Sequence, residues 1–118
     1  MLQVLGPITV PVPGTPVRAT STITTDASGI TNDPTRFSCH AALFQARQAN
    51  TGRVYIGTVN MIRATGVGVA AVLAIPTANA IPAFSVSLTL APAGVDLSEL
   101  YVDADVADEG VLLTLLVT

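Results

Sequence analysis

The chain is poor in the residues that most often carry chemistry. It contains no Lys and no Trp, one Cys and one His, and only 11% of its 118 residues are charged, against about 25% in an ordinary soluble domain. A single cysteine excludes an internal disulfide, and a single histidine excludes a multi-histidine metal site. Five Arg against eight acidic residues leave no basic surface for nucleic acid. We therefore expect no metal, no other cofactor and no nucleic-acid partner.

Aromatic residues make up 4% of the chain, whereas half of all residues are hydrophobic. Proline and glycine interrupt the long, mostly uncharged run that begins at Ala64, so no window of about 20 residues suits a membrane helix. The first residues lack the basic and apolar regions of a signal peptide. We expect one domain, made in the cytoplasm and not inserted in a membrane. Its low charge and high aliphatic content indicate that a partner covers part of its surface.

Proline shapes the first sixteen residues. Four prolines lie between Pro7 and Pro16, which excludes a helix and favours an extended arm or an edge strand. The aliphatic residues among them suit a protein partner better than solvent. We predict a Pro-rich N-terminal arm over residues 1–16, ordered by a neighbouring subunit, and one domain over residues 17–118. The partner contacts predicted in the arm are Leu5, Ile8, Val10 and Val12.

Alternation of apolar and polar residues predicts strands through the rest of the chain. The clearest is Ala83–Leu90, and Val111–Val117 is apolar on both faces, so it should be central or covered. Residues 36–46 are predicted as a strand, with a short helix as the alternative. Asn50-Thr51-Gly52 is the expected hairpin turn into a strand over Arg53–Val59.

Shorter strands are expected at Val17–Ile23, Val69–Ile75 and Tyr101–Ala104, and one helical turn at Asp96–Leu100. About seven strands with Pro and Gly turns and no long helix predict an all-β fold, a β-sandwich or jelly roll.

No group of side chains predicts catalysis. Cys39 and His40 are neighbours, which point to opposite faces of a strand and so cannot pair as nucleophile and base. Six acidic residues crowd between Asp96 and Glu109 without the spacing of a calcium loop or a sugar-binding aromatic platform. A solvated turn is the simplest interpretation. Gly66-Val67-Gly68 lacks the Lys of a phosphate loop and is expected to form a turn.

Arg53 and Tyr55 share one face of their predicted strand. Solvent exposure is the simpler interpretation for both, and contact with a partner is the alternative. We include both residues among the candidate partner contacts and expect no enzymatic activity.

The order of several motifs resembles a known group of proteins. The motifs are Pro13-Gly14-Thr15-Pro16-Val17, Gln45-Ala46-Arg47, Asn50-Thr51-Gly52-Arg53-Val54-Tyr55-Ile56-Gly57 and Asp96-Leu97-Ser98-Glu99-Leu100-Tyr101-Val102-Asp103-Ala104, followed by a terminal strand. In this order they resemble the small all-β virion proteins of tailed bacteriophages. Those proteins sit on the capsid exterior as cement, decoration or head-fibre components. The resemblance spans about residues 13–117 and departs between Val59 and Pro82, a longer and more Ala-rich stretch.

The resemblance implies a non-enzymatic structural protein of the virion. It would be made in the host cytoplasm, bind the major capsid protein on the outside of the shell as a cement or decoration protein, and form a homo-oligomer, either a dimer or a trimer. The alternative is a receptor- or carbohydrate-binding β-sandwich module of a head fibre or tail. Exposed aromatic residues would favour that alternative, and only Tyr55 and Tyr101 are candidates.

Overall fold

The computed structural model describes residues 2–20, 38–39, 41–87 and 95–116, and the side chains of residues 6–20, 41–86 and 97–116. The elements within these ranges are short strands and one 3-10 turn. They are β1 (Leu2–Val10), β2 (Val17–Arg18), β3 (Ser38–Cys39), β4 (Ala41–Ala46), β5 (Val54–Ile62), β6 (Val67–Leu73), β7 (Ala83–Ser87), β8 (Val95–Asp96), η1 (Leu97–Glu99), β9 (Tyr101–Ala104) and β10 (Glu109–Leu116).

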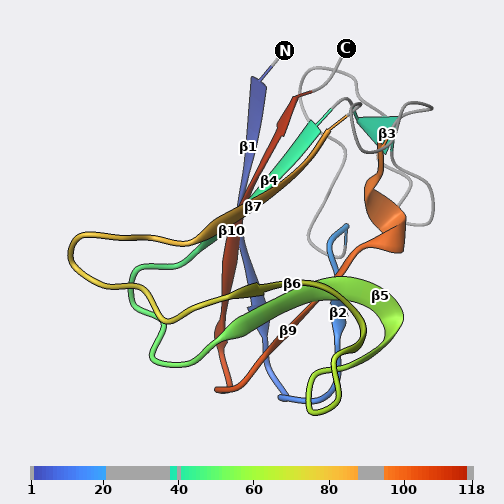
Figure 1. Ribbon diagram of the computed structural model, residues 1–118. Helices are drawn as coiled ribbons and strands as arrows, with labels where there is room; N and C mark the ends of the chain where they lie inside the picture. The colour runs from blue at the N-terminus through green and yellow to red at the C-terminus, as the bar shows by residue number, and fades with distance from the viewer. Residues whose placement is uncertain (1, 21–37, 40, 88–94, 117–118) are drawn as a thin grey trace.

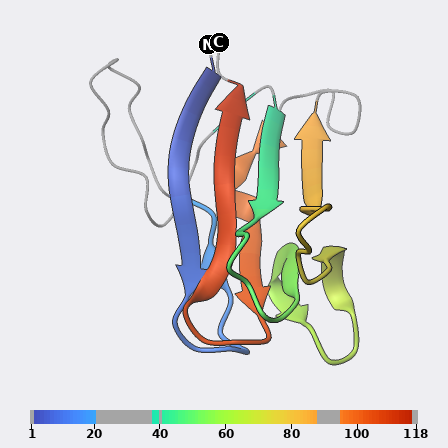
Figure 2. The same ribbon diagram turned by 90° about the vertical axis from the view of Figure 1, so that its left-hand side faces the viewer.

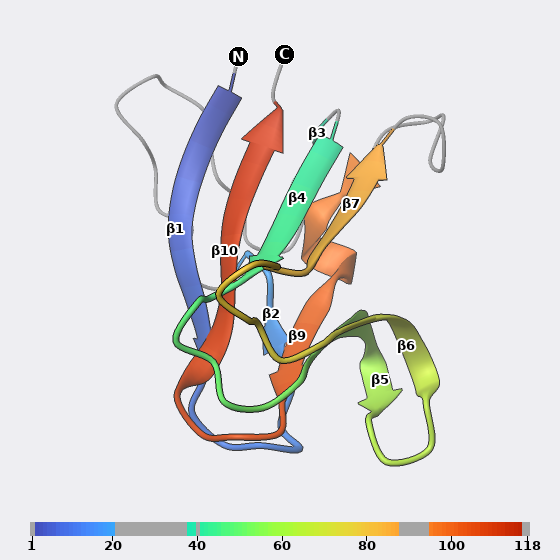
Figure 3. The same ribbon diagram turned by 60° about the vertical axis from the view of Figure 1, so that its left-hand side comes forward.

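Eight of these strands form two antiparallel sheets that pack face to face as a β-sandwich (Figure 1). Sheet A has the order β1-β10-β4-β7, and sheet B has the order β2-β9-β5-β6. The strands of sheet A lie side by side in Figures 2 and 3. β3 and β8 form a separate pair. The predicted all-β sandwich is confirmed.

The core lies between the two sheets. Every second residue of a strand points inward, and the inward residues of the central strands are fully buried aliphatic side chains with one aromatic ring. They include Phe44 of β4, Ile56 of β5, Val102 of β9, and Val111, Leu113 and Leu115 of β10. The sandwich is therefore held together by aliphatic packing, as the composition indicates.

β10 is one of the two inner strands of sheet A. It pairs with β1 on one side and with β4 on the other. This confirms the prediction that the terminal apolar run is central. Its outward residues Leu112 and Leu116 are nevertheless exposed.

The first strand corrects the predicted arm. Leu2–Val10 pairs with β10 from Leu2 opposite Leu116 to Val10 opposite Glu109, so this part of the arm is an edge strand of sheet A. The side chains of Ile8 and Val10 are fully buried in the chain's own core. An edge strand pairs on one side only, which is why it tolerates a proline that cannot donate to the ladder. Residues 11–16 form the turn to β2.

The predicted hairpin between residues 36–46 and Arg53–Val59 is wrong. Ala41–Ala46 is a strand as predicted, but β4 pairs with β10 and β7 in sheet A, whereas β5 pairs with β6 and β9 in sheet B. The connecting loop therefore crosses from one layer of the sandwich to the other. Residues 36, 37 and 40 lie outside the described part of the chain.

The Asn50-Thr51-Gly52 segment docks on the start of β10 instead of closing a hairpin. The Glu109 carboxylate accepts hydrogen bonds from the backbone N–H groups of Thr51 and Gly52, at 2.7 and 2.9 Å. The Thr51 hydroxyl donates to the same carboxylate at 2.8 Å, and the side-chain amide of Asn50 donates to the Gly110 carbonyl at 2.8 Å. These bonds satisfy the polar groups of a turn that has no strand partner.

The remaining predicted elements differ mainly at their ends. The strand predicted at Val69–Ile75 is β6, the helical turn is η1, and Tyr101–Ala104 is β9. The strand predicted at Val17–Ile23 is described only as far as residue 20, as β2 and two further residues, 19 and 20. The strand predicted at Ala83–Leu90 is described only over β7. His40 and the side chain of Cys39 lie outside the described residues, so the structure does not address their orientation.

Candidate protein-binding surface

The stretch from β5 to β7 exposes large aliphatic side chains. Of the eleven exposed large hydrophobic residues among the described ones, six lie in what we call the 59–81 segment, each with 40 to 58% of its surface exposed. They are Val59, Ile62, Val67, Val72, Ile75 and Ile81. Arg63 is the only charged residue in this segment. Exposed apolar groups gathered in one segment are typical of a surface that binds another protein.

The first half of the 59–81 segment is the hairpin of β5 and β6, which bends out of line with the rest of sheet B (Figures 1 and 3). The pairing register shifts between Ile56 and Gly57 and again between Gly57 and Ile62. A Cβ at Gly57 would lie 2.1 Å from the carbonyl oxygen of Gly68, so only glycine allows the two strands to approach this closely.

The turn at the end of this hairpin depends on two glycines. Gly66 has a φ of +80° and Gly68 a φ of +71°, in the left-handed region that other residues rarely adopt. The turn spans residues 63–66, so the predicted turn at Gly66-Val67-Gly68 is confirmed for Gly66, whereas Val67 and Gly68 already belong to β6. Where the two strands meet the turn, Ile62 pairs with Val67, and both side chains are exposed.

Arg63 holds the hairpin against β9. Its Nε lies 3.5 Å from Oδ2 of Asp103, and one terminal nitrogen donates a hydrogen bond to Oδ1 of Asp105 at 2.8 Å. The core-facing residues of β9 are Val102 and Ala104, so the two carboxylates lie on the outer face of sheet B. We call these three residues the Arg63 clasp. It fixes the position of the hairpin relative to the sandwich.

Asp103 is the buried part of the clasp, with only 1% of its side chain exposed. Its Oδ1 accepts hydrogen bonds from the backbone N–H of Gly14 at 3.0 Å and of Ala104 at 2.8 Å. A buried carboxylate requires such partners, because burial removes its hydration. Asp103 therefore ties the β1–β2 turn and the β5–β6 hairpin to the same strand.

Asp105 is the more exposed carboxylate and has two further partners. The Tyr55 hydroxyl donates to Oδ1 at 3.1 Å, and Nε of Arg53 lies 3.3 Å from Oδ2. Burial alone would raise the pKa of Asp105, but the hydrogen bonds from Tyr55, Arg63 and Arg53 outweigh it and hold that pKa below its usual value. Burial, followed by the bond to Asp105, raises the pKa of Tyr55. At neutral pH Asp105 is thus a charged carboxylate that accepts a hydrogen bond from a neutral phenol.

The structure places the six predicted partner contacts in different environments. Ile8 and Val10 are buried in the core, which corrects their assignment to a partner. Val12 is exposed on the β1–β2 turn, and the side chain of Leu5 is not among the described ones. Tyr55 is 4% exposed and its hydroxyl donates a hydrogen bond to Asp105, whereas Arg53 lies at the surface.

Sequence reasoning missed Arg63, Asp103 and the aliphatic residues around them. The predicted solvated acidic turn is wrong for Asp103, which is buried and paired with Arg63. The available signal was the alternation Val102-Asp103-Ala104, which places one carboxylate on a strand among buried neighbours. Among the residues that the structure describes, no three His, Cys, Asp or Glu side chains are grouped as a metal site requires.

Comparison with known proteins yields no relative. No protein-family model matches the chain, and neither a curated protein nor a solved structure matches it. In the described parts of the chain, no helix has the length and apolar character needed to cross a membrane.

Proposed function

We propose that the chain is a non-enzymatic structural protein of a tailed-phage virion, a cement or decoration protein that binds the outer surface of the major capsid protein shell. The motif order from Pro13 to the terminal strand supports the virion assignment. The observation that carries the proposal in the structure is the 59–81 segment, which exposes aliphatic side chains and whose hairpin is held by the partly buried ion pair of Arg63 and Asp103.

The geometry suits binding to a protein better than chemistry on a small molecule. The Arg63 clasp fixes the hairpin before any partner arrives, so little conformational entropy is lost when the hairpin docks. Burying Ile62 or Val67 removes apolar surface from water, at about 25 cal/mol per Å². Repeated copies on a closed shell would reinforce each weak contact through a high effective concentration.

The same segment is where the chain departs from the phage proteins that it resembles. A surface that matches one particular shell has reason to differ between proteins that share a fold, because specificity lies in the contact residues. We therefore place the shell contact on the 59–81 segment and the common scaffold on the two sheets.

The alternative, a carbohydrate-binding module, has less support. Such sites use an exposed aromatic face. Tyr55 is 4% exposed, and the guanidinium of Arg18 lies 5.5 Å from the centre of the Tyr101 ring. The two candidate aromatic residues are thus engaged within the chain.

The test is co-sedimentation of the full chain with shells assembled from the major capsid protein of the same phage. We expect the wild-type chain to bind at a fixed ratio to the capsid protein. The double variant Ile62→Asp/Val67→Asp should lose at least tenfold in affinity, because it places charges on the hairpin that meets the shell. The control is Val106→Asp, which adds a charge at an exposed valine in the turn before β10.

Equal binding of the hairpin variant and the wild type would exclude the 59–81 segment as the contact. Absence of the wild-type chain from the shell pellet at every concentration would exclude the decoration role. Thermal melts of all three proteins show whether each variant is folded.

A further inference from the structure

The outer face of sheet A carries no charged side chain among the described residues. Its outward residues alternate with the core residues on each strand. They are Pro7, Thr9, Ala41, Leu43, Gln45, Ala83, Ser85, Leu112, Thr114 and Leu116. The described charged residues lie on sheet B, on β8, on η1, in loops, or at Glu109, the first residue of β10. One face of the sandwich is thus neutral and the other is charged.

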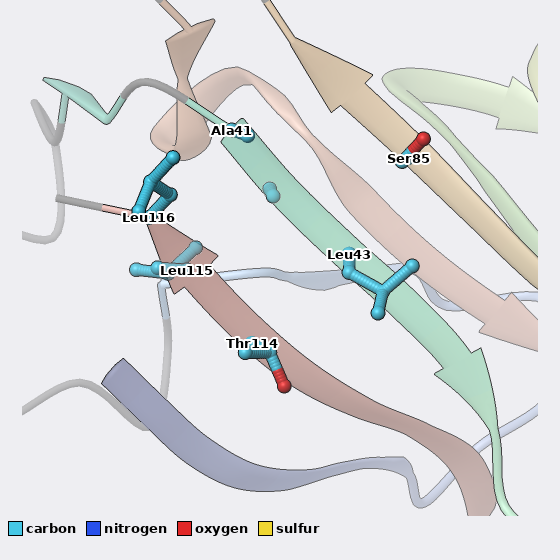
Figure 4. Close-up of a pocket in the computed structure, with 7 residues that line it drawn as sticks. Ala41, Leu43, Ser85, Thr114, Leu115 and Leu116 are labelled. Atoms are coloured by element: carbon cyan, nitrogen blue, oxygen red, sulfur yellow. The ribbon is translucent and has the colours of Figure 1, made fainter. Parts of the chain in front are cut away.

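A hollow of about 150 Å³ opens on this neutral face (Figure 4). The register explains it, because Leu43 lies opposite Thr114 on one side and Ser85 on the other, and Ala41 lies opposite Leu116. The small side chains of Ala41 and Ser85 leave space between the larger leucines. The full lining is Ala41, Ala42, Leu43, Ser85, Thr114, Leu115 and Leu116.

Protruding leucines lie on the same face as the hollow. Leu43, Leu112 and Leu116 are each between 39 and 47% exposed. An apolar space of about 150 Å³ is large enough to hold a benzene-sized group, and a leucine side chain is of that size. The face therefore presents both a projecting leucine and a space that accepts one.

We propose that two copies of this chain pair through the outer face of sheet A, about a two-fold axis, with a leucine of each copy seated in the hollow of the other. A two-fold interface uses one patch on both copies, so that patch must be complementary to itself. A neutral face with a projection beside a hollow meets this requirement.

The absence of charge among the described residues of this face favours a second copy of the chain as its binding partner. The chain has a net charge of −3, so two copies repel each other wherever their acidic surfaces approach. The outer face of sheet A brings no described charge to the contact, and no charge is desolvated when it is covered. A partner chosen for charge complementarity would find nothing to pair with on this face.

The size of the face predicts how tightly the copies bind. Four strands about 4.8 Å apart and about 25 Å long give a footprint of roughly 500 Å² per copy. Two such footprints make about 1,000 Å², the lower end of specific interfaces. We therefore expect a reversible dimer with a dissociation constant in the micromolar range.

The experiment is sedimentation velocity of the full chain over a concentration series from about 1 µM to 1 mM, a range that brackets the expected dissociation constant. Leu43→Glu places a charge on the neutral face and should raise the dissociation constant at least tenfold. Val106→Glu is the matched control, because Val106 is 38% exposed, against 39% for Leu43, and lies in the turn before β10. It should leave the dissociation constant within about twofold of the wild type.

Ala41→Leu separates a specific fit from general stickiness. It makes the face more apolar but fills the hollow with the chain's own side chain. The proposal expects weaker dimerisation, again by at least tenfold, whereas non-specific association would become stronger. A wild-type chain that stays monomeric up to 1 mM, a dimer insensitive to Leu43→Glu, or a dimer strengthened by Ala41→Leu would each overturn the proposal. Thermal melts confirm that each variant is folded, and no capsid is needed.

Discussion

The guanidinium of Arg63 lies against the carboxylate of Asp103, with Nε 3.5 Å from Oδ2, although the first residue is 29% exposed and the second only 1%. The pair joins the β5–β6 hairpin to a buried acid of β9. Removing Asp103 and removing Arg63 have different consequences. Without Asp103 the arginine can turn toward water. Without Arg63 the carboxylate stays buried with its backbone partners alone.

Arg63→Leu should therefore destabilise the fold. We expect a loss of about 1–3 kcal/mol in the free energy of unfolding, because a buried carboxylate loses its charged partner. Urea unfolding followed by circular dichroism measures this loss. The control is Arg53→Leu, since Arg53 is largely exposed and lies 3.3 Å from Asp105, and a surface pair contributes about 0–1 kcal/mol. Equal losses in the two variants would contradict the role given to the Arg63 clasp.

Stability should fall at acid pH partly through Asp105. Its pKa is lowered in the folded state, so its contribution is complete above the unfolded-state value near 4 and is lost as the pH falls through the folded-state pKa. Urea midpoints between pH 7 and pH 2 should therefore fall more steeply below about pH 4 in the wild type than in Asp105→Asn. Parallel curves would show that Asp105 has the same pKa in both states. Glu109, whose pKa is also lowered, is present in both proteins and cancels in the comparison.

The edge strand β1 should be needed for stability. Ile8→Ala removes a fully buried side chain and should cost about 2–4 kcal/mol in the free energy of unfolding. Val12→Ala, four residues further along at an exposed position, should change it by less than about 0.5 kcal/mol. Guanidinium unfolding of both variants checks the difference. If Ile8→Ala were as stable as the wild type, β1 would be a detachable arm as the prolines suggest.

The loop that connects β4 to β5 should be held in place by the carboxylate of Glu109. Glu109→Ala leaves the N–H groups of Thr51 and Gly52 without their acceptor, and we expect a loss of about 1–2 kcal/mol. Glu99→Ala is the control, because Glu99 is exposed in η1. Hydrogen exchange adds a local readout: the Thr51 and Gly52 amides should exchange faster in Glu109→Ala and at the wild-type rate in Glu99→Ala. Unchanged exchange would show that Glu109 does not hold the loop.

The sequence was sufficient to predict the strands and the class of fold. Period-two alternation marks Ala83–Ser87, and apolar residues on both faces mark β10 as an inner strand, because both signals depend on nearby residues alone. Which strands pair was harder to predict. The Asn50-Thr51-Gly52 segment has a typical hairpin composition, but its hydrogen bonds go to Glu109 and Gly110, far along the chain.

The candidate surface was harder to predict for the same reason. Arg63, Asp103 and Asp105 come together only after sheet B has formed, and nothing near Arg63 in the sequence marks its partners. Pro7 led to a different error, the prediction that β1 is part of an arm outside the core. It correctly excluded a central strand, but the buried neighbours Ile8 and Val10 show that an edge strand can still supply core residues.

The strand order of sheet A has a consequence for synthesis. β10 is synthesised after every other described strand, yet it lies between β1 and β4, which do not pair with each other. Sheet A therefore cannot close until β10 has been made, and until then the inward residues of β1 lack their strand partner. Such non-local pairing slows folding and prolongs the exposure of apolar surface. Nascent chains of this protein should be natural clients for ribosome-associated chaperones until β10 emerges.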